Sequence, residues 1–124
     1  ALTIAFPGPH GASQVHLLRV DRTTVALHHH IALMAHRRGR YAEALRHWRK
    51  VLDRNPRDGL ALYNSACALA RLDRRDEALQ RLSEAIIVAP RRFAPLVEHD
   101  PDLASLRDSP ALRRWILQGR ELDL

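Results

Sequence analysis

Two stretches of this chain match one another when one of them is shifted by 34 residues. The matched positions run through a whole unit, in the pairs Ala32 and Ala66, Arg37 and Arg71, Arg40 and Arg74, Glu43 and Glu77, Ala44 and Ala78, Leu45 and Leu79, Pro56 and Pro90, and Arg57 and Arg91. A fixed period of this length is typical of a solenoid, in which stacked units bury a shared core that no single unit can bury alone. Stacked units also leave a groove, so the repeat favours binding over catalysis.

Each unit is predicted to be a helix, a tight turn and a second helix. The second half of each unit carries an apolar stripe at helical spacing, formed by Tyr41, Ala44, Leu45, Trp48, Val51 and Leu52 in the first unit and by Ala78, Leu79, Leu82, Ala85, Ile86 and Ala89 in the second. Helical stretches at 24–38 and 58–71 precede these stripes, with Gly39 or Asp73 at the turn. We expect Ala44 where the two helices come closest, because only a small side chain allows that approach.

The order of small, large and proline positions resembles the tetratricopeptide repeat. Gly39, Tyr41, Ala44, Leu45, Trp48, Val51, Leu52 and Pro56 are similar to the second half of one repeat, and Leu62, Tyr63, Asn64, Ala66, Leu69, Ala78, Leu79, Leu82, Ala85 and Pro90 to a complete one. The resemblance covers residues 25–92 and implies an all-α, TPR-type α-solenoid with repeats at 25–58 and 59–92. The chain departs from the family at Ala32 and Ala66, where glycine is usual, and at His28 and Leu62, where a large aromatic side chain is usual.

The copy fails after Arg92, and residues 93–124 are predicted to form a helical cap. Asp100-Pro101 and Ser109-Pro110 each place a capping side chain before a proline, which predicts short helices at 101–107 and 110–118. The segment 100–107 also resembles the stretch that often closes a tetratricopeptide array. The apolar side chains expected to cover the second unit are Leu103, Leu106, Leu112, Trp115 and Ile116.

Residues 1–22 are interpreted as an N-terminal arm that is irregular or a short β structure. Leu2, Ile4 and Phe6 alternate as in a strand, whereas residues 15–20 fit either a second strand or the start of a helix. The arm either packs on the repeats or pairs with another chain, or it is a loosely ordered tail or the remnant of an upstream domain. Residues 23–92 then hold the two repeats.

The formal charge of +6 comes almost wholly from arginine, an arginine-rich composition found in bacteria with G- and C-rich genomes. Within residues 37–57, one outer helical face carries the basic patch Arg46, Arg49, Lys50 and Arg57. This patch is either a solvated surface, which we favour, or a binding site for an acidic protein or a phosphate backbone. Nucleic acid is disfavoured, because Tyr41 and Trp48 are already needed for packing and leave no aromatic ring free to stack on bases.

The sequence predicts neither an enzyme nor a metal or cofactor site. It contains no glycine-rich phosphate loop and no nucleophile beside a base, and the consecutive residues 28–30, all histidine, point about 100° apart on a helix. Cys67 is the single cysteine, so it forms no internal disulfide and weakly favours a reducing, cytoplasmic compartment. No apolar run approaches the 18 or so residues of a membrane span.

The predicted function is that of an adaptor or scaffold that binds another protein or peptide. In the tetratricopeptide family the first helix of each unit lines a concave groove, which by resemblance implies the groove residues His29, Leu33, His36, Arg37, Tyr63, Asn64, Cys67 and Arg71. The carboxylate clamp of chaperone-binding members does not carry over, since its lysine and asparagine positions in the first unit are His29 and Leu33. Two alternatives stay open: a structural subunit locked into a homo-oligomer or larger complex through the arm and the convex face, and a binder of acidic partners through the basic patch.

Overall fold

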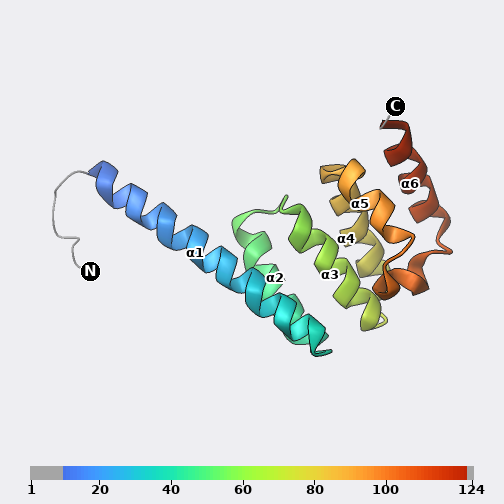
Figure 1. Cartoon of the computed structure of the whole chain (residues 1–124), viewed down its shortest axis with the longest axis horizontal. Coiled ribbons are helices and arrows are strands. Elements are labelled where there is room, and N and C mark those ends of the chain that lie inside the picture. The colour runs from blue at the N-terminus through green and yellow to red at the C-terminus, as the bar shows by residue number, and fades with distance from the viewer. Residues whose placement is uncertain (1–9, 123–124) are drawn as a thin grey trace.

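The computed structural model describes the backbone of residues 10–122 and the side chains of residues 22–118. Within these residues the chain forms only helices, in the order α1 (His10–Arg37), α2 (Tyr41–Arg54), α3 (Gly59–Arg71), α4 (Arg75–Val88), α5 (Pro90–Val97), the 3-10 helix η2 (Pro101–Leu106) and α6 (Pro110–Leu122). Figure 1 shows α1 and α2 followed by α3 and α4 as neighbouring hairpins, with α5, η2 and α6 at the far end. The predicted all-α solenoid is confirmed.

The two hairpins turn in the same way, as the repeat requires. Gly39 has a φ of 77° and Asp73 a φ of 60°, so both residues at the predicted turns adopt the left-handed conformation that ends a helix. In each turn the next amide donates back to a carbonyl five residues earlier, at 2.8 Å in the first hairpin and 2.9 Å in the second. Glycine adopts this conformation without strain, whereas aspartate does so at some cost.

Small residues lie at the crossing of the paired helices. Ala32 and Ala44 in the first hairpin, and Ala66 and Ala78 in the second, are all 0% exposed. Their size lets α1 approach α2 and α3 approach α4, and Trp48, also 0% exposed, fills the wider space next to the first contact. The core therefore follows the positions that the repeat predicts.

The C-terminal segment covers the second hairpin through its apolar side chains. Leu103, Leu106, Leu112 and Ile116 are fully buried, and Trp115 is half-buried. Contacts run from α6 to α4 and α5, and from η2 to α3. The segment predicted at 101–107 is the 3-10 helix η2, and the helix predicted at 110–118 extends to residue 122.

The N-terminal arm differs from its prediction, because α1 begins at His10. Of the two alternatives left open for residues 15–20, the structure has the helix and does not support the second β-strand. The strand predicted at residues 2–6 lies outside the described residues. The sequence between Gly11 and Gly39 contains neither glycine nor proline. Nothing therefore stops the helix that packs on α2 from continuing toward the N-terminus, where it extends well past its partner (Figure 1). None of the helices described between residues 10 and 122 is both long and apolar enough to cross a bilayer.

Candidate partner-binding site

The first helix of each hairpin carries one stripe of side chains on a shared side of the solenoid, and we call this surface the groove face. Helical spacing and contacts with η2 define it as His29, Leu33, His36 and Arg37 of α1 and Leu60, Tyr63, Asn64, Cys67 and Arg71 of α3. It contains all eight residues predicted from the resemblance. The structure divides them into a closed part, in contact with the chain's own C-terminal segment, and an open part.

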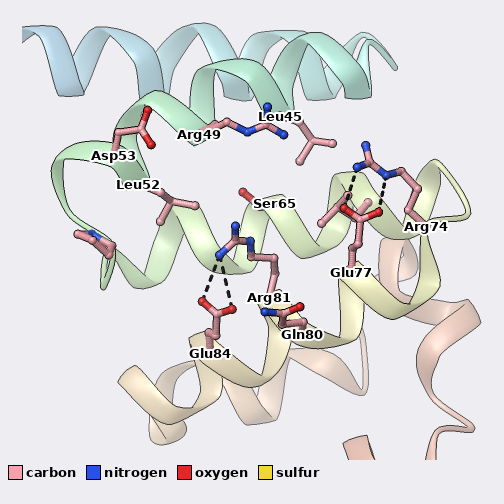
Figure 2. Close-up of a pocket in the computed structure, with 12 residues that line it drawn as sticks. Leu45, Arg49, Leu52, Asp53, Ser65, Arg74, Glu77, Gln80, Arg81 and Glu84 are labelled. Atoms are coloured by element: carbon pink, nitrogen blue, oxygen red, sulfur yellow. Dashed lines mark hydrogen bonds and ion pairs between the residues drawn. The ribbon is translucent and has the colours of Figure 1, made fainter.

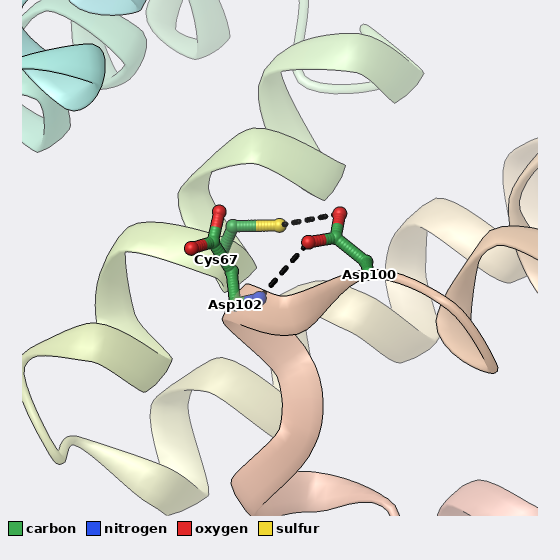
Figure 3. Close-up of side chains that lie close together, drawn as sticks. All are labelled: Cys67, Asp100 and Asp102. Atoms are coloured by element: carbon green, nitrogen blue, oxygen red, sulfur yellow. Dashed lines mark hydrogen bonds between the residues drawn. The ribbon is translucent and has the colours of Figure 1, made fainter.

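Asp100, just before η2, closes one part of the groove face. The Tyr63 hydroxyl donates to its Oδ2 at 2.6 Å, and the Cys67 thiol donates weakly to the same oxygen at 3.7 Å. Its other oxygen, Oδ1, accepts the Asp102 backbone amide at 3.0 Å, which is the predicted cap of this helix. Figure 3 shows the thiol and the backbone amide converging on this carboxylate. Asp100 therefore joins α3 to the start of η2.

Asp102 closes the neighbouring part by joining two hairpins. It accepts from His36 Nε2 on α1 at 2.8 Å and from Arg71 Nε on α3 at 2.6 Å. Because a carboxylate only accepts, the His36 ring carries a hydrogen on Nε2. Burial raises the pKa of Asp102, but the hydrogen bonds and charges of His36 and Arg71 outweigh burial, so the pKa lies below its ordinary value. The negative form of Asp102 is the one that the groove face stabilises.

The Cys67 thiol and the Tyr63 phenol of the closed part are held in their protonated, unreactive forms. Burial, followed by the nearby Asp100, raises the pKa of both Cys67 and Tyr63 far above the ordinary range. A thiol that stays protonated is a poor nucleophile. The ligand atoms of Cys67, Asp100 and Asp102 lie within 4.8 Å of one another, yet both carboxylates already accept hydrogen bonds from the protein. This group fits a hydrogen-bonded lock better than a metal centre.

The open part of the groove face consists of side chains that keep exposed area beside the closed part. Leu33 is 37% and Leu60 40% exposed, Asn64 is half-buried, and Arg37 is exposed. His29 behaves differently, because its Nε2 lies 3.1 Å from a carboxylate oxygen of Asp58, which also caps α3. His29 is therefore occupied in holding the two hairpins together.

Leu60 of the groove face, and the two carboxylates that close part of it, were not predicted from the sequence as site residues. Leu60 lies one turn before Asn64 on the same stripe, so helical periodicity alone was sufficient to find it. Asp100 was predicted only as a helix cap, and Asp102 was not predicted. Their contacts span 31 to 66 residues along the chain, and no local pattern encodes a contact of that range.

The opposite side of the solenoid carries a groove of about 320 Å³ between α2, α3 and α4. Figure 2 shows it as a mostly charged cleft with Ser65 on its floor. Arg74 is paired with Glu77 through bonds of 2.9 and 2.7 Å, and Arg81 lies 3.2 Å from Glu84. Much of the charge in this groove is therefore already neutralised by ion pairs within the protein. A charged ligand would have to break these pairs in order to bind there.

All four residues of the predicted basic patch are exposed on or after α2. Arg49 lines the charged groove together with Glu77, whose pKa is lowered mainly by its hydrogen bond with Arg74 and to a smaller degree by the charge of Arg49. Positive charge is therefore balanced on that side. Arg46 and Lys50 instead lie near His47, whose Nδ1 is 3.0 Å from Nδ1 of His28 across the hairpin. Burial, followed by the charges of His28 and Lys50, lowers the pKa of His47.

The stacked hairpins and the groove face define a helical-repeat protein of the α-solenoid class. A family model described as the tetratricopeptide repeat matches residues 35–107, which is more than half of the chain. The chain therefore belongs to the tetratricopeptide repeat family, whose repeats generally mediate protein–protein interaction. No curated protein matches the chain.

Proposed function

We propose that this chain is a non-catalytic protein-interaction module that binds an extended segment of a partner protein on the open part of its groove face. One observation carries the proposal: the chain's own residues 100–102 already lie on the adjacent part of the same face. There, two carboxylates accept hydrogen bonds from four side chains of α1 and α3. The open part alongside it carries two further polar side chains, Asn64 and Arg37, that are suited to hold a second segment.

The open part indicates what that partner segment must offer. Leu33 and Leu60 supply exposed apolar area, and covering the two-fifths or so of each side chain that is still exposed would contribute about 1 kcal/mol. The Asn64 amide can both donate to and accept from an extended backbone. Arg37 favours a carboxylate at one end. The expected ligand is therefore an extended segment with one or two apolar side chains and an acidic residue.

A non-catalytic function agrees with the chemistry of this surface. Cys67 and Tyr63 are the nearest nucleophilic groups, and both remain protonated at neutral pH. Each donates its hydrogen to a carboxylate rather than to a base that could activate it. The family to which the chain belongs is typically non-catalytic as well.

The experiment is a pull-down from native cell extract at low and high salt, with this chain as bait beside a Leu33→Glu, Asn64→Ala variant. Both side chains are accessible, so the variant should fold as the original chain does. Tyr63 is unsuitable for this purpose, because it is 5% exposed, stacks on Phe93 with ring centroids 5.2 Å apart, and donates to Asp100. The matched control is Ile87→Glu, which introduces the same charge at a position that is 70% exposed on α4.

A protein partner that resists high salt, is lost with the groove variant and is retained with the control would support the proposal. A partner that the groove variant retains would contradict it, and would move the interface to another surface. A partner released by salt alone would instead favour the basic patch of Arg46, Arg49, Lys50 and Arg57.

A further inference from the structure

The N-terminal end of the solenoid has an uncovered apolar stripe, which we call the end face. It consists of Leu27, Ile31, Met34 and Arg38, at helical spacing on the side of α1 away from the groove face. Leu27 is 54% exposed, and Ile31 and Met34 are only half-buried. The last three of the four also line a groove of about 320 Å³ between α1 and α2. In the described part of the chain, no helix packs over this stripe.

The internal repeat shows what normally lies on this face. A shift of 34 residues carries the end face onto Ala61, Ser65 and Ala68 of α3 and onto Leu72, which follows the last residue of α3. Ala61 and Ala68 are 0% exposed and Ser65 is 3% exposed, and α3 packs there against α2, the second helix of the preceding hairpin. The same face is thus covered by a helix in the second unit and open in the first.

The side chains on the end face indicate the shape of a helix that could cover it. Leucine, isoleucine and methionine stand on α1 where α3 has alanine, serine and alanine. At the second unit, Leu45 and Leu52 of α2 lie opposite the small residues of α3. Protein interiors are close-packed, so a helix that packs equally close to the larger residues of α1 must itself have smaller side chains at these two positions. Where the second unit has Leu72, the first has the exposed Arg38, which favours an acidic residue opposite it.

We propose that the end face is a docking site for one amphipathic helix of a partner, which takes the place that α2 takes on α3. This helix runs antiparallel to α1, presents alanine-sized side chains to Leu27 and Met34, and has an acidic residue in its first turn beside Arg38. Such a residue also interacts favourably with the helix dipole. This site is separate from the proposed groove-binding function and does not depend on it.

The test uses a fluorescent, hydrocarbon-stapled peptide based on residues 41–54, because α2 is the chain's own example of a helix on this face. In the small-face peptide, Leu45→Ala and Leu52→Ala supply the small side chains, and Glu43 remains as the acidic residue of the first turn. Trp48→Gln and Val51→Gln remove the stripe that would face away from α1. A comparison peptide keeps both leucines, and a staple is needed because an isolated helix of this length is marginal in water.

Binding is measured by fluorescence anisotropy against the full chain, against a Leu27→Glu, Arg38→Glu variant and against Ile87→Glu. All three positions are exposed, so each variant should melt at the temperature of the original chain. We expect the small-face peptide to bind at least about tenfold more tightly than the leucine peptide, a difference of about 1.4 kcal/mol. We also expect binding to fall at least about tenfold in the end-face variant but not in the Ile87 variant.

Three results would overturn the proposal. The first is no binding of the small-face peptide. The second is equal binding to the original chain and the end-face variant. The third is self-association of the chain in analytical ultracentrifugation that the Leu27→Glu, Arg38→Glu change abolishes, since a second copy would then occupy the end face.

Discussion

Replacing Asp102 by asparagine tests whether charge holds η2 on the groove face. Asparagine has the same shape as aspartate but lacks the negative charge that attracts the Arg71 guanidinium and strengthens the bond from His36. Hydrogen bonds to charged groups contribute about 1.5–3 kcal/mol. The Asp102 side chain is still 20% exposed and asparagine keeps one acceptor oxygen, so we expect a loss of about 1–2 kcal/mol of unfolding free energy.

The pH dependence of this loss separates charge from shape. The pKa of Asp102 is lowered from 3.8 in the folded chain, so its contribution is fully present above that value and is lost as the pH falls through the folded pKa. The difference in stability between the original chain and Asp102→Asn should therefore be constant near pH 7 and shrink below pH 3.8.

Urea unfolding, followed by circular dichroism from pH 7 down to about pH 3, measures this difference. With a slope of about 2 kcal/mol per M, the middle of the typical range, the midpoint should fall by roughly 0.5–1 M at pH 7. The matched control is Asp108→Asn, because Asp108 also pairs with an arginine, Arg75 at 3.0 Å, but is 83% exposed. We expect no measurable loss from the control. Equal losses in both variants, or a loss in Asp102→Asn that persists at low pH, would refute the reasoning.

Three further predictions follow from single positions. Asp73→Gly should raise the unfolding free energy by up to about 1 kcal/mol, since glycine relieves the positive φ at this turn, and Gly39→Ala should lower it by a similar amount; opposite signs in urea unfolding would contradict this. Cys67 should react with a thiol reagent at pH 8 only at the rate of global unfolding, because burial raises its pKa; rapid labelling of the folded chain would disprove its burial. The pKa of His47 is lowered from 6.5 in the folded chain, so as the pH drops the unfolded chain takes up the proton on His47 before the folded chain does. Stability should therefore fall as the pH drops below 6.5. Melting temperatures that fall equally in the His47→Gln variant would contradict this.

The hairpins could be predicted from the sequence because their causes are local. Alanine at 44 and 78 and the turn residues Gly39 and Asp73 each act on their immediate neighbours, and the repeat presents the same solution twice. The helix that continues back to residue 10 was left undecided between strand and helix for the opposite reason. A short apolar stretch fits the spacing of a strand as well as that of a helix. The stretch becomes helical because it continues, without glycine or proline, into a helix that is already held by packing on α2.

The sequence analysis named the residues of the groove face but not the C-terminal residues that bond to some of them. Family resemblance implied the positions of Tyr63, Cys67 and Arg71, since helical spacing fixes which side of a helix faces the groove. It did not predict that Asp100 and Asp102 bond to these residues, because the path of the chain after α5 depends on packing between distant segments. The pairing of His28 with His47 was missed similarly, since the two residues belong to different helices.

The bond between His36 and Asp102 changes how an array of this kind should unfold. In a simple solenoid each unit contacts only its neighbours, so the ends can fray independently and stability is a sum of local terms. Here a contact between residues 66 positions apart ties the first hairpin to the C-terminal segment across the second hairpin. Losing either end therefore removes a contact from the other, which makes unfolding more nearly all-or-none. Closing so long a loop also has an entropic cost during folding, so this bond is expected to form late, after the hairpins have stacked.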